Sequence, residues 1–210
     1  GTAQVGDTIT LEGAGTKTVT GLVADLTLDA TNTSTTGVTT GNASLTINAN
    51  AAAGALTVDS ELAQDKTLTL TGGANGTTAT VNNLVADLVA TTLASALTVD
   101  LADDAVDNAI SITTGTYTTS INDSAATDTI TVNAAAISDN VLLSTAGAGD
   151  FIISDLQGNL SNTASGSVSV TLADNTDGLY TVTSSTAITV ANGTAQVGDT
   201  ITLEGAGTKT

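Results

Sequence analysis

One stretch of the chain gathers enough carboxylates to hold a metal ion. Four aspartates lie within eight positions: Asp100, Asp103, Asp104 and Asp107. A second, smaller group is Asp174, Asn175 and Asp177. Hard oxygen ligands of this kind suit Ca²⁺. The glycine-rich GGxGxDxUx repeat and the EF-hand loop are both absent, however, so we expect solvated acidic loops and keep calcium as a weaker alternative.

The sequence contains few side chains that could carry out catalysis. The chain has no His, Cys or Arg, and its cations are Lys17, Lys66 and Lys209. General base catalysis near neutral pH and thiol nucleophiles are therefore excluded, and we predict that this is not an enzyme. Thr-x-Thr pairs are frequent, as in ice-binding solenoids. Their irregular spacing makes ice binding only a third functional alternative. The pairs are Thr8/Thr10, Thr16/Thr18, Thr67/Thr69, Thr78/Thr80 and Thr129/Thr131.

The charge restricts the possible partners. The formal net charge is -18 at pH 7. Neutralising phosphates requires Lys and Arg, so we expect no nucleic-acid partner. Anionic membrane surfaces are disfavoured for the same reason. No stretch approaches the roughly 18 apolar residues of a membrane span, and we predict no membrane insertion in this segment.

Short runs with an apolar residue at every second position predict β-strands throughout the chain. Gly, Asn, Asp and Ser clusters between them supply turns. Ten such runs begin within 192 residues, a mean spacing of about 19, which suits one coil of a parallel β-helix. The runs begin at Thr8, Asp25, Ser44, Thr67, Ala96, Ala109, Thr129, Phe151, Ser167 and Ala187. Additional strand candidates start at Gly54, Thr78, Leu84, Asn140 and Leu179.

The chain contains an identical long repeat. Residues 193–210 have the same sequence as residues 1–18, GTAQVGDTITLEGAGTKT. We therefore predict that residues 1–192 are one full tandem repeat and that residues 193–210 begin the next, as one continuous solenoid without a linker. Onsets at Thr8, Thr67 and Thr129 also suggest an older three-fold duplication inside the repeat.

Two architectures fit these observations. We favour an all-β parallel β-solenoid of about ten coils per 192-residue repeat. The alternative is an array of Ig-like β-sandwiches, since 192 is twice 96. Sandwiches normally use aromatic anchors and linkers, whereas this chain has one Phe, two Tyr and no Trp. The absence of Pro suits strands that donate hydrogen bonds on both sides.

In these features the chain resembles giant tandem-repeat bacterial surface proteins, the filamentous-haemagglutinin-like adhesins. The resemblance rests on the identical repeat, the Thr/Ala/Asp/Gly/Val/Asn bias and the lack of Cys and Pro. It implies an extracellular, cell-surface filament that gives reach, spacing or adhesion, with further copies of itself as partner. The alternative function is a calcium-dependent adhesin stalk of Ig-like domains.

Overall fold

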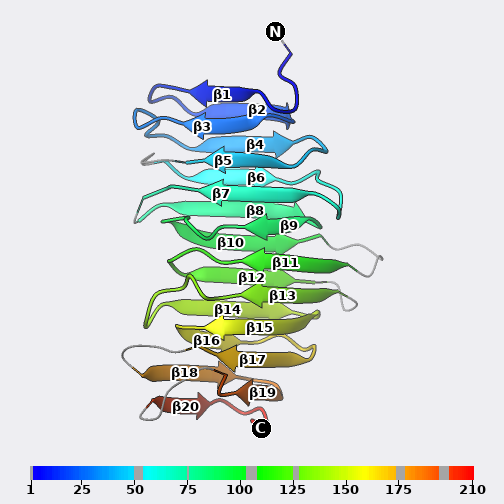
Figure 1. The fold of residues 1–210 in the computed structure, drawn as a ribbon, viewed down its shortest axis with the longest axis vertical. Helices are drawn as coiled ribbons and strands as arrows, with labels where there is room; N and C mark the ends of the chain where they lie inside the picture. Colours follow the sequence, from blue (N-terminus) through cyan, green and yellow to red (C-terminus); the bar gives the residue numbers. More distant parts are fainter. Residues whose placement is uncertain are drawn as a thin grey trace.

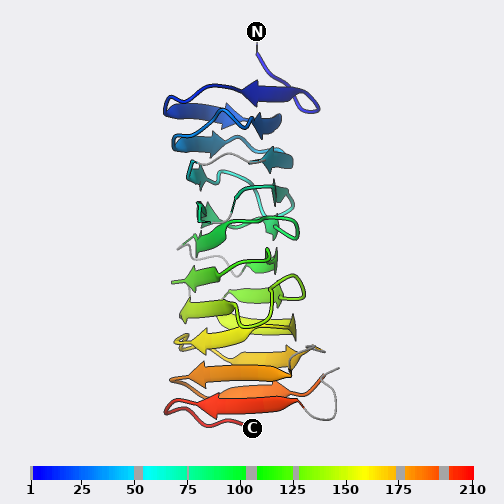
Figure 2. The ribbon, with the colours of Figure 1, turned by 90° about the vertical axis from the view of Figure 1, so that its left-hand side faces the viewer.

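The fold is a stack of β-strands in two layers (Figures 1 and 2). A computed structural model describes residues 2–49, 54–74, 76–102, 108–124, 128–173, 178–193 and 199–210. Within these ranges the chain forms twenty β-strands and no helix. The strands divide into two ten-stranded sheets, which we call the odd sheet and the even sheet.

Successive strands alternate between the two sheets. The odd sheet contains β1 (Thr8–Leu11), β3 (Asp25–Leu28), β5 (Leu45–Asn48), β7 (Thr67–Thr71), β9 (Asp87–Val89), β11 (Ala109–Thr113), β13 (Thr129–Asn133), β15 (Asp150–Leu156), β17 (Val168–Leu172) and β19 (Ile188–Ala191). The even sheet contains β2 (Lys17–Leu22), β4 (Thr36–Thr40), β6 (Leu56–Asp59), β8 (Thr78–Leu84), β10 (Ala96–Leu101), β12 (Thr119–Asp123), β14 (Leu142–Gly147), β16 (Asn159–Asn162), β18 (Leu179–Ser184) and β20 (Thr200–Glu204). Each turn of the chain therefore adds one strand to each sheet.

Within each sheet, neighbouring strands pair in parallel, as in β1 with β3 and β2 with β4. This confirms the predicted parallel β-solenoid. The alternative of Ig-like sandwiches, and with it a calcium-dependent stalk of such domains, is wrong for this segment, because Ig sheets are antiparallel. Each strand interior to its sheet bonds to the turn before it and the turn after it. Backbone hydrogen bonds thus run along the axis of the stack.

The predicted number of turns needs a correction. From β1 to the identical sequence in β20 the chain makes nineteen strand-to-strand steps, which is nine and a half turns rather than ten. Nine of the ten counted onsets lie in the odd sheet, and Ala96 begins β10 of the even sheet while β9 was not counted, so the count of ten equals the number of odd-sheet strands. The half-turn difference arises because the repeated sequence returns in β20 of the even sheet. Alternation reveals a strand but says nothing about the sheet that contains it.

The core lies between the two sheets and is built from the alternate residues of each strand. Leu68 and Leu70 of β7 have no exposed surface, and Leu70 is in register with Ile47 of the turn before. The predicted inward positions are confirmed: all lie in the core or pack against it. They are Ile9, Leu11, Leu26, Leu28, Leu45, Ile47, Leu68, Leu70, Ile130, Val132, Ile188 and Val190. Each inward side chain thus stacks on one in the next turn.

A corner motif recurs three times where the chain crosses between sheets. It starts at a residue with positive φ, continues with a buried leucine, and reaches a side-chain acceptor three positions after that leucine. The three copies are Gly21-Leu22 with Asp25, Asn83-Leu84 with Asp87, and Asp155-Leu156 with Asn159. At each leucine the strand register shifts, so the positive-φ residue marks a β-bulge.

The acceptor of this motif joins one turn to the next. Asp25 Oδ1 accepts a hydrogen bond from the backbone N–H of Thr46 (2.7 Å), and Asp87 Oδ1 accepts one from Ser111 (2.9 Å). In the third copy Asn159 Oδ1 accepts from Thr181 at 2.8 Å. Some of the chain's many acidic side chains are therefore part of the fold itself.

The corner motif points to another candidate for a third internal copy. Residues 142–160 align without gaps with residues 8–26, sharing Gly-Ala-Gly and the final Leu-x-x-(Asp/Asn)-Leu. The first two copies begin in β1 and β7 of the odd sheet, but this one begins in β14 of the even sheet. The predicted onset at Thr129 is β13, an ordinary strand of the odd sheet. TITVNA at this onset matches the alternation of the earlier copies and not their corner, whereas residues 142–160 contain the corner.

Candidate functional site

The acidic residues do not come together as a metal site in the described part of the chain. Asp100 lies in β10, and its carboxylate accepts a hydrogen bond from Asn122 Nδ2 at 3.4 Å. Asp103, Asp104 and Asp107 lie outside the described residues, as do Asp174, Asn175 and Asp177. Among the described residues, no three His, Cys, Asp or Glu side chains are grouped to hold a metal. The calcium alternative at residues 100–107 stays a prediction.

One ion pair connects neighbouring residues of an exposed loop. Lys66 Nζ lies 2.6 Å from Asp65 Oδ2, and this hydrogen bond lowers the pKa of the Asp65 carboxyl below its usual value. Solvent-exposed pairs contribute little to stability. The pair is therefore not a candidate for a functional site.

Chelation tests the calcium alternative directly. We expect excess EDTA to leave the circular dichroism spectrum and the melting temperature of the protein nearly unchanged. The reason is that described acids such as Asp25 and Asp87 accept backbone N–H groups, which requires no metal. A chain with Asp103 and Asp107 replaced by Asn serves as the control. A fall of many degrees on chelation, abolished in that variant, would instead establish a structural calcium site.

The Thr-x-Thr pairs do not form a continuous ladder. Thr8/Thr10, Thr67/Thr69 and Thr129/Thr131 lie in β1, β7 and β13, three turns apart in the odd sheet, whereas Thr78/Thr80 lie in β8 of the even sheet. The register interrupts each run: Thr8 pairs with Asp25, and Thr69 pairs with Thr46 on one side but with Val89 on the other. The regular threonine surface that motivated ice binding is therefore interrupted.

The most distinctive local structure is a corner formed by residues 13–17 and again by residues 205–209, which we call the glycine–lysine corner. Gly13 and Gly205 have nearly the same positive φ, 86° and 89°. Lys17 Nζ donates to the carbonyl oxygens of Gly13 and Gly15, the latter at 2.8 Å. Lys209 Nζ donates to those of Gly205 and Gly207 at 2.7 and 2.6 Å. The same sequence thus builds the same clamped loop twice.

The two corners differ in what lies beside them. A Cβ on Gly205 or Gly207 would overlap the carbonyl oxygen of Ser184 or Thr186 in the preceding turn. Lys209 Nζ also donates to Ser184 O at 3.2 Å. At Gly13 and Gly15, by contrast, no atom of the described residues lies within 4 Å of such a Cβ. The glycines are therefore required where another turn lies directly against the corner.

The second copy lies in the opposite sheets from the first. Residues 8–11 form β1 of the odd sheet, whereas Thr200–Glu204 form β20 of the even sheet and pair with β18. Lys17 begins β2 of the even sheet, whereas Lys209 forms a bridge with Ile188 in the odd sheet. The two copies are thus half a turn out of phase.

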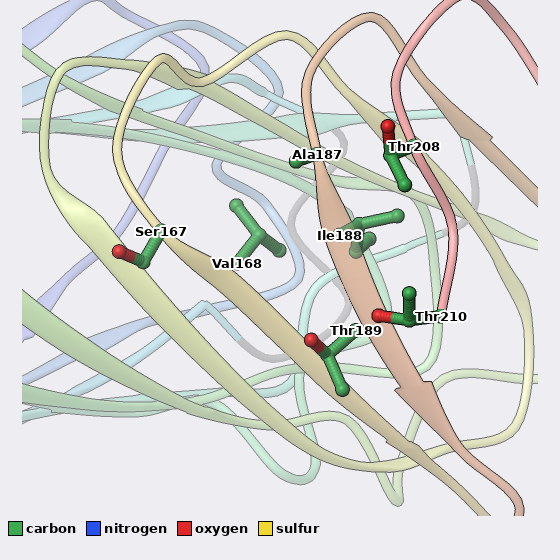
Figure 3. Close-up of a pocket in the computed structure, with 7 residues that line it drawn as sticks. All are labelled: Ser167, Val168, Ala187, Ile188, Thr189, Thr208 and Thr210. Atoms are coloured by element: carbon green, nitrogen blue, oxygen red, sulfur yellow. The ribbon is translucent and has the colours of Figure 1, made fainter.

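The inward side chains of β20 continue the apolar stacks of the turn before it. Ile201 and Leu203 are in register with the buried Tyr180 and Val182, yet remain 37% and 44% exposed. A hollow of about 380 Å³ lies beside the final odd-sheet turn. Figure 3 shows its lining, with Thr208 and Thr210 on the last segment of the chain and Ile188 and Thr189 on the strand beside it.

Comparison with known proteins gave no match. The chain fits no family model, and no curated protein or solved structure is significantly similar to it. No helix in the described ranges is long and apolar enough to span a membrane. The geometry of the corner and of the end turn therefore carries the functional argument.

Sequence reasoning identified the repeat but missed this corner. The signal was available: Gly-Ala-Gly occurs at residues 13–15, 147–149 and 205–207. In the middle copy, a Cβ on Gly147 would overlap the Asp123 carbonyl oxygen of the neighbouring even strand. In the copies at residues 147–149 and 205–207, these glycines lie where consecutive turns touch.

Proposed function

We propose that this chain is a segment of an extracellular, filament-forming structural protein, built from tandem copies of a 192-residue repeat. It gives a bacterial cell surface reach, spacing or adhesion, and its partner is the next copy of itself. One observation carries the proposal. The residues that restart the repeat, 199–210, extend both sheets in parallel register with the turns before them.

The packing of the restarted sequence on the turn before it supports this reading energetically. Ile201 and Leu203 lie in register with the buried Tyr180 and Val182, so the restarted sequence removes apolar surface of the preceding turn from water, at about 25 cal/mol per Å². An unpaired sheet edge also invites pairing with another strand. In a tandem array each copy covers the edge of the one before, so that stability accumulates from neighbouring turns. The sequence that begins the repeat thus stabilises the repeat that precedes it.

The direction of the hydrogen bonds supports a mechanical role. All described strand pairs are parallel and stack along the filament axis, so that tension is shared by rows of backbone hydrogen bonds in two sheets. A formal charge of -18 on 210 residues keeps such filaments soluble and apart. The cell-surface setting and the adhesive role rest on the compositional resemblance described above.

Electron microscopy of a chain of several repeats tests the proposal. We expect uniform thin rods whose length grows by about 46 Å per repeat, because nine and a half turns each advance about 4.8 Å. Fibre diffraction should give a strong meridional reflection near 4.8 Å. A chain of one repeat provides the length control. Beads on a string, or an advance near 80 Å per repeat, would overturn the filament proposal.

A further inference from the structure

The half-turn between the two copies has a consequence for the whole filament. The identical sequence TITLEGAGTKT begins in the odd sheet at Thr8 and in the even sheet at Thr200. Between these two positions lie nineteen steps, an odd number, while each turn contains two strands. If one copy begins in one sheet, the next copy therefore begins in the other sheet.

We propose that successive repeats are related by a half-turn about the filament axis, so that each copy docks on its neighbour with its two sheets exchanged. This inference rests on the proposed tandem array. The structural repeat of the filament then spans two copies, 384 residues and nineteen turns, or about 91 Å at 4.8 Å per turn. Apart from the gradual twist of the stack, the filament has a two-fold screw axis.

The surface that accepts the next copy is the last turn of the solenoid. Residues 200–203 have the sequence of β1, and β1 pairs with β3 through Ile9 with Leu26 and Leu11 with Leu28. The same register on β20 places the next copy's Leu26 and Leu28 over Ile201 and Leu203. These two exposed side chains would then be buried like their equivalents in the interior turns.

The fold tolerates this exchange because the corner is independent of the sheet in which it starts. The hydrogen bonds that hold the corner are local, because Lys17 and Lys209 donate to carbonyl groups two and four residues before them. Gly13 and Gly205 also have nearly the same φ. The internal copies show the same freedom, since those at β1 and β7 start in the odd sheet and that at β14 starts in the even sheet. The copies begin at β1, β7, β14 and β20, so they lie six, seven and six strands apart. These intervals add up to nineteen strand-to-strand steps, which is an odd number.

The exchange makes the two sides of the filament chemically equivalent. Ile152 is 47% exposed on the outer face of β15. In alternate copies this side chain would appear on opposite sides of the rod. A neighbouring filament of the same chain would therefore meet identical surfaces whichever side it approached.

Paired cysteines test the half-turn in the 210-residue chain, which has no cysteine of its own. Thr181 and Thr202 are register partners on β18 and β20. Their Cα atoms are thus about 4.8 Å apart, within the range of a disulfide. We expect T181C/T202C to cross-link on mild oxidation. The control T189C/T202C, which would cross-link if the second copy restarted on β19 in the odd sheet, should stay reduced.

Gold labelling of I152C in a chain of several repeats provides the second measurement. Labels should alternate between the two sides of the rod at axial steps of about 46 Å. Cross-linking of the control pair, failure of both pairs, or labels along one side would each overturn the half-turn. The cysteine result does not depend on filament formation, so beads in the micrograph combined with a T181C/T202C cross-link would overturn only the filament.

Discussion

Replacing Leu70 with Asp is expected to unfold the centre of the solenoid. Leu70 has no exposed surface and lies in register with Ile47 of the preceding turn. Loss of a buried leucine costs about 2–5 kcal/mol by itself, and an unpaired buried carboxylate adds several more. Since domains are stable by only about 5–15 kcal/mol, the sum approaches the total stability. Circular dichroism melting of the 210-residue chain should show a fall of tens of degrees or no folded baseline.

The matched control is Thr69→Asp, one position earlier in the same strand. Thr69 points outward and is half-buried between Thr46 and Val89. A new carboxylate there remains hydrated, and surface substitutions usually change the free energy of unfolding by no more than about 0.5 kcal/mol. If Leu70→Asp melted like Thr69→Asp, the assignment of inward and outward faces along β7 would be wrong.

The strands and their inward faces could be predicted because they depend on local alternation. Leu68 and Leu70 alternate with Thr67, Thr69 and Thr71, and only one face of such a strand can be buried. All five additional strand candidates also belong to strands, such as β6 and β18. Four strands that begin or end in polar residues were missed. They are β2, β4, β12 and β16.

Three of the four missed strands, β4, β12 and β16, have polar side chains at buried inward positions. In β4 the inward positions are Thr36, Val38 and Thr40, and both threonines are fully buried. Asn32 Nδ2 donates to Thr36 Oγ1 at 3.0 Å, so the hydroxyl is satisfied inside the solenoid. In β16 the buried Asn162 accepts from Thr145 Oγ1 at 2.8 Å. Hydrogen bonds within a turn, as at Thr36, or between turns, as at Asn162, replace apolar stacking there, and hydrophobic alternation does not detect them.

The half-turn could not be predicted from strand counting. The half-turn depends on which sheet contains each strand, and the corners between strands determine this. The corner at residues 21–25 leads from the even to the odd sheet, whereas the corner at residues 155–159 leads from the odd to the even sheet. Both corners contain a positive-φ residue followed by a buried leucine. Because the motif fits either crossing, its sequence does not reveal the direction.

The glycine–lysine corner provides the second large effect, through a pair of identical substitutions in a chain of two complete repeats. Gly13→Ala places a side chain at φ 86° where no atom of the described residues lies within 4 Å. Only the backbone strain of about 1–3 kcal/mol opposes it. Gly205→Ala introduces the same strain at φ 89°, and its Cβ would also overlap the Ser184 carbonyl oxygen.

The sequence around both sites is identical, so the difference between the two variants isolates the contact between turns. The overlap with the Ser184 carbonyl oxygen destabilises the Gly205→Ala variant by about 1–3 kcal/mol more than the backbone strain alone. This additional loss occurs at the junction on which the second copy is stacked. We expect Gly205→Ala to lower the melting temperature well below that of Gly13→Ala and to separate the melting of the two copies. Hydrogen exchange should localise the loss to β18 and β20. Equal melting of the two variants would mean that the corner does not rest on the preceding turn, and would remove the contact that joins one repeat to the next.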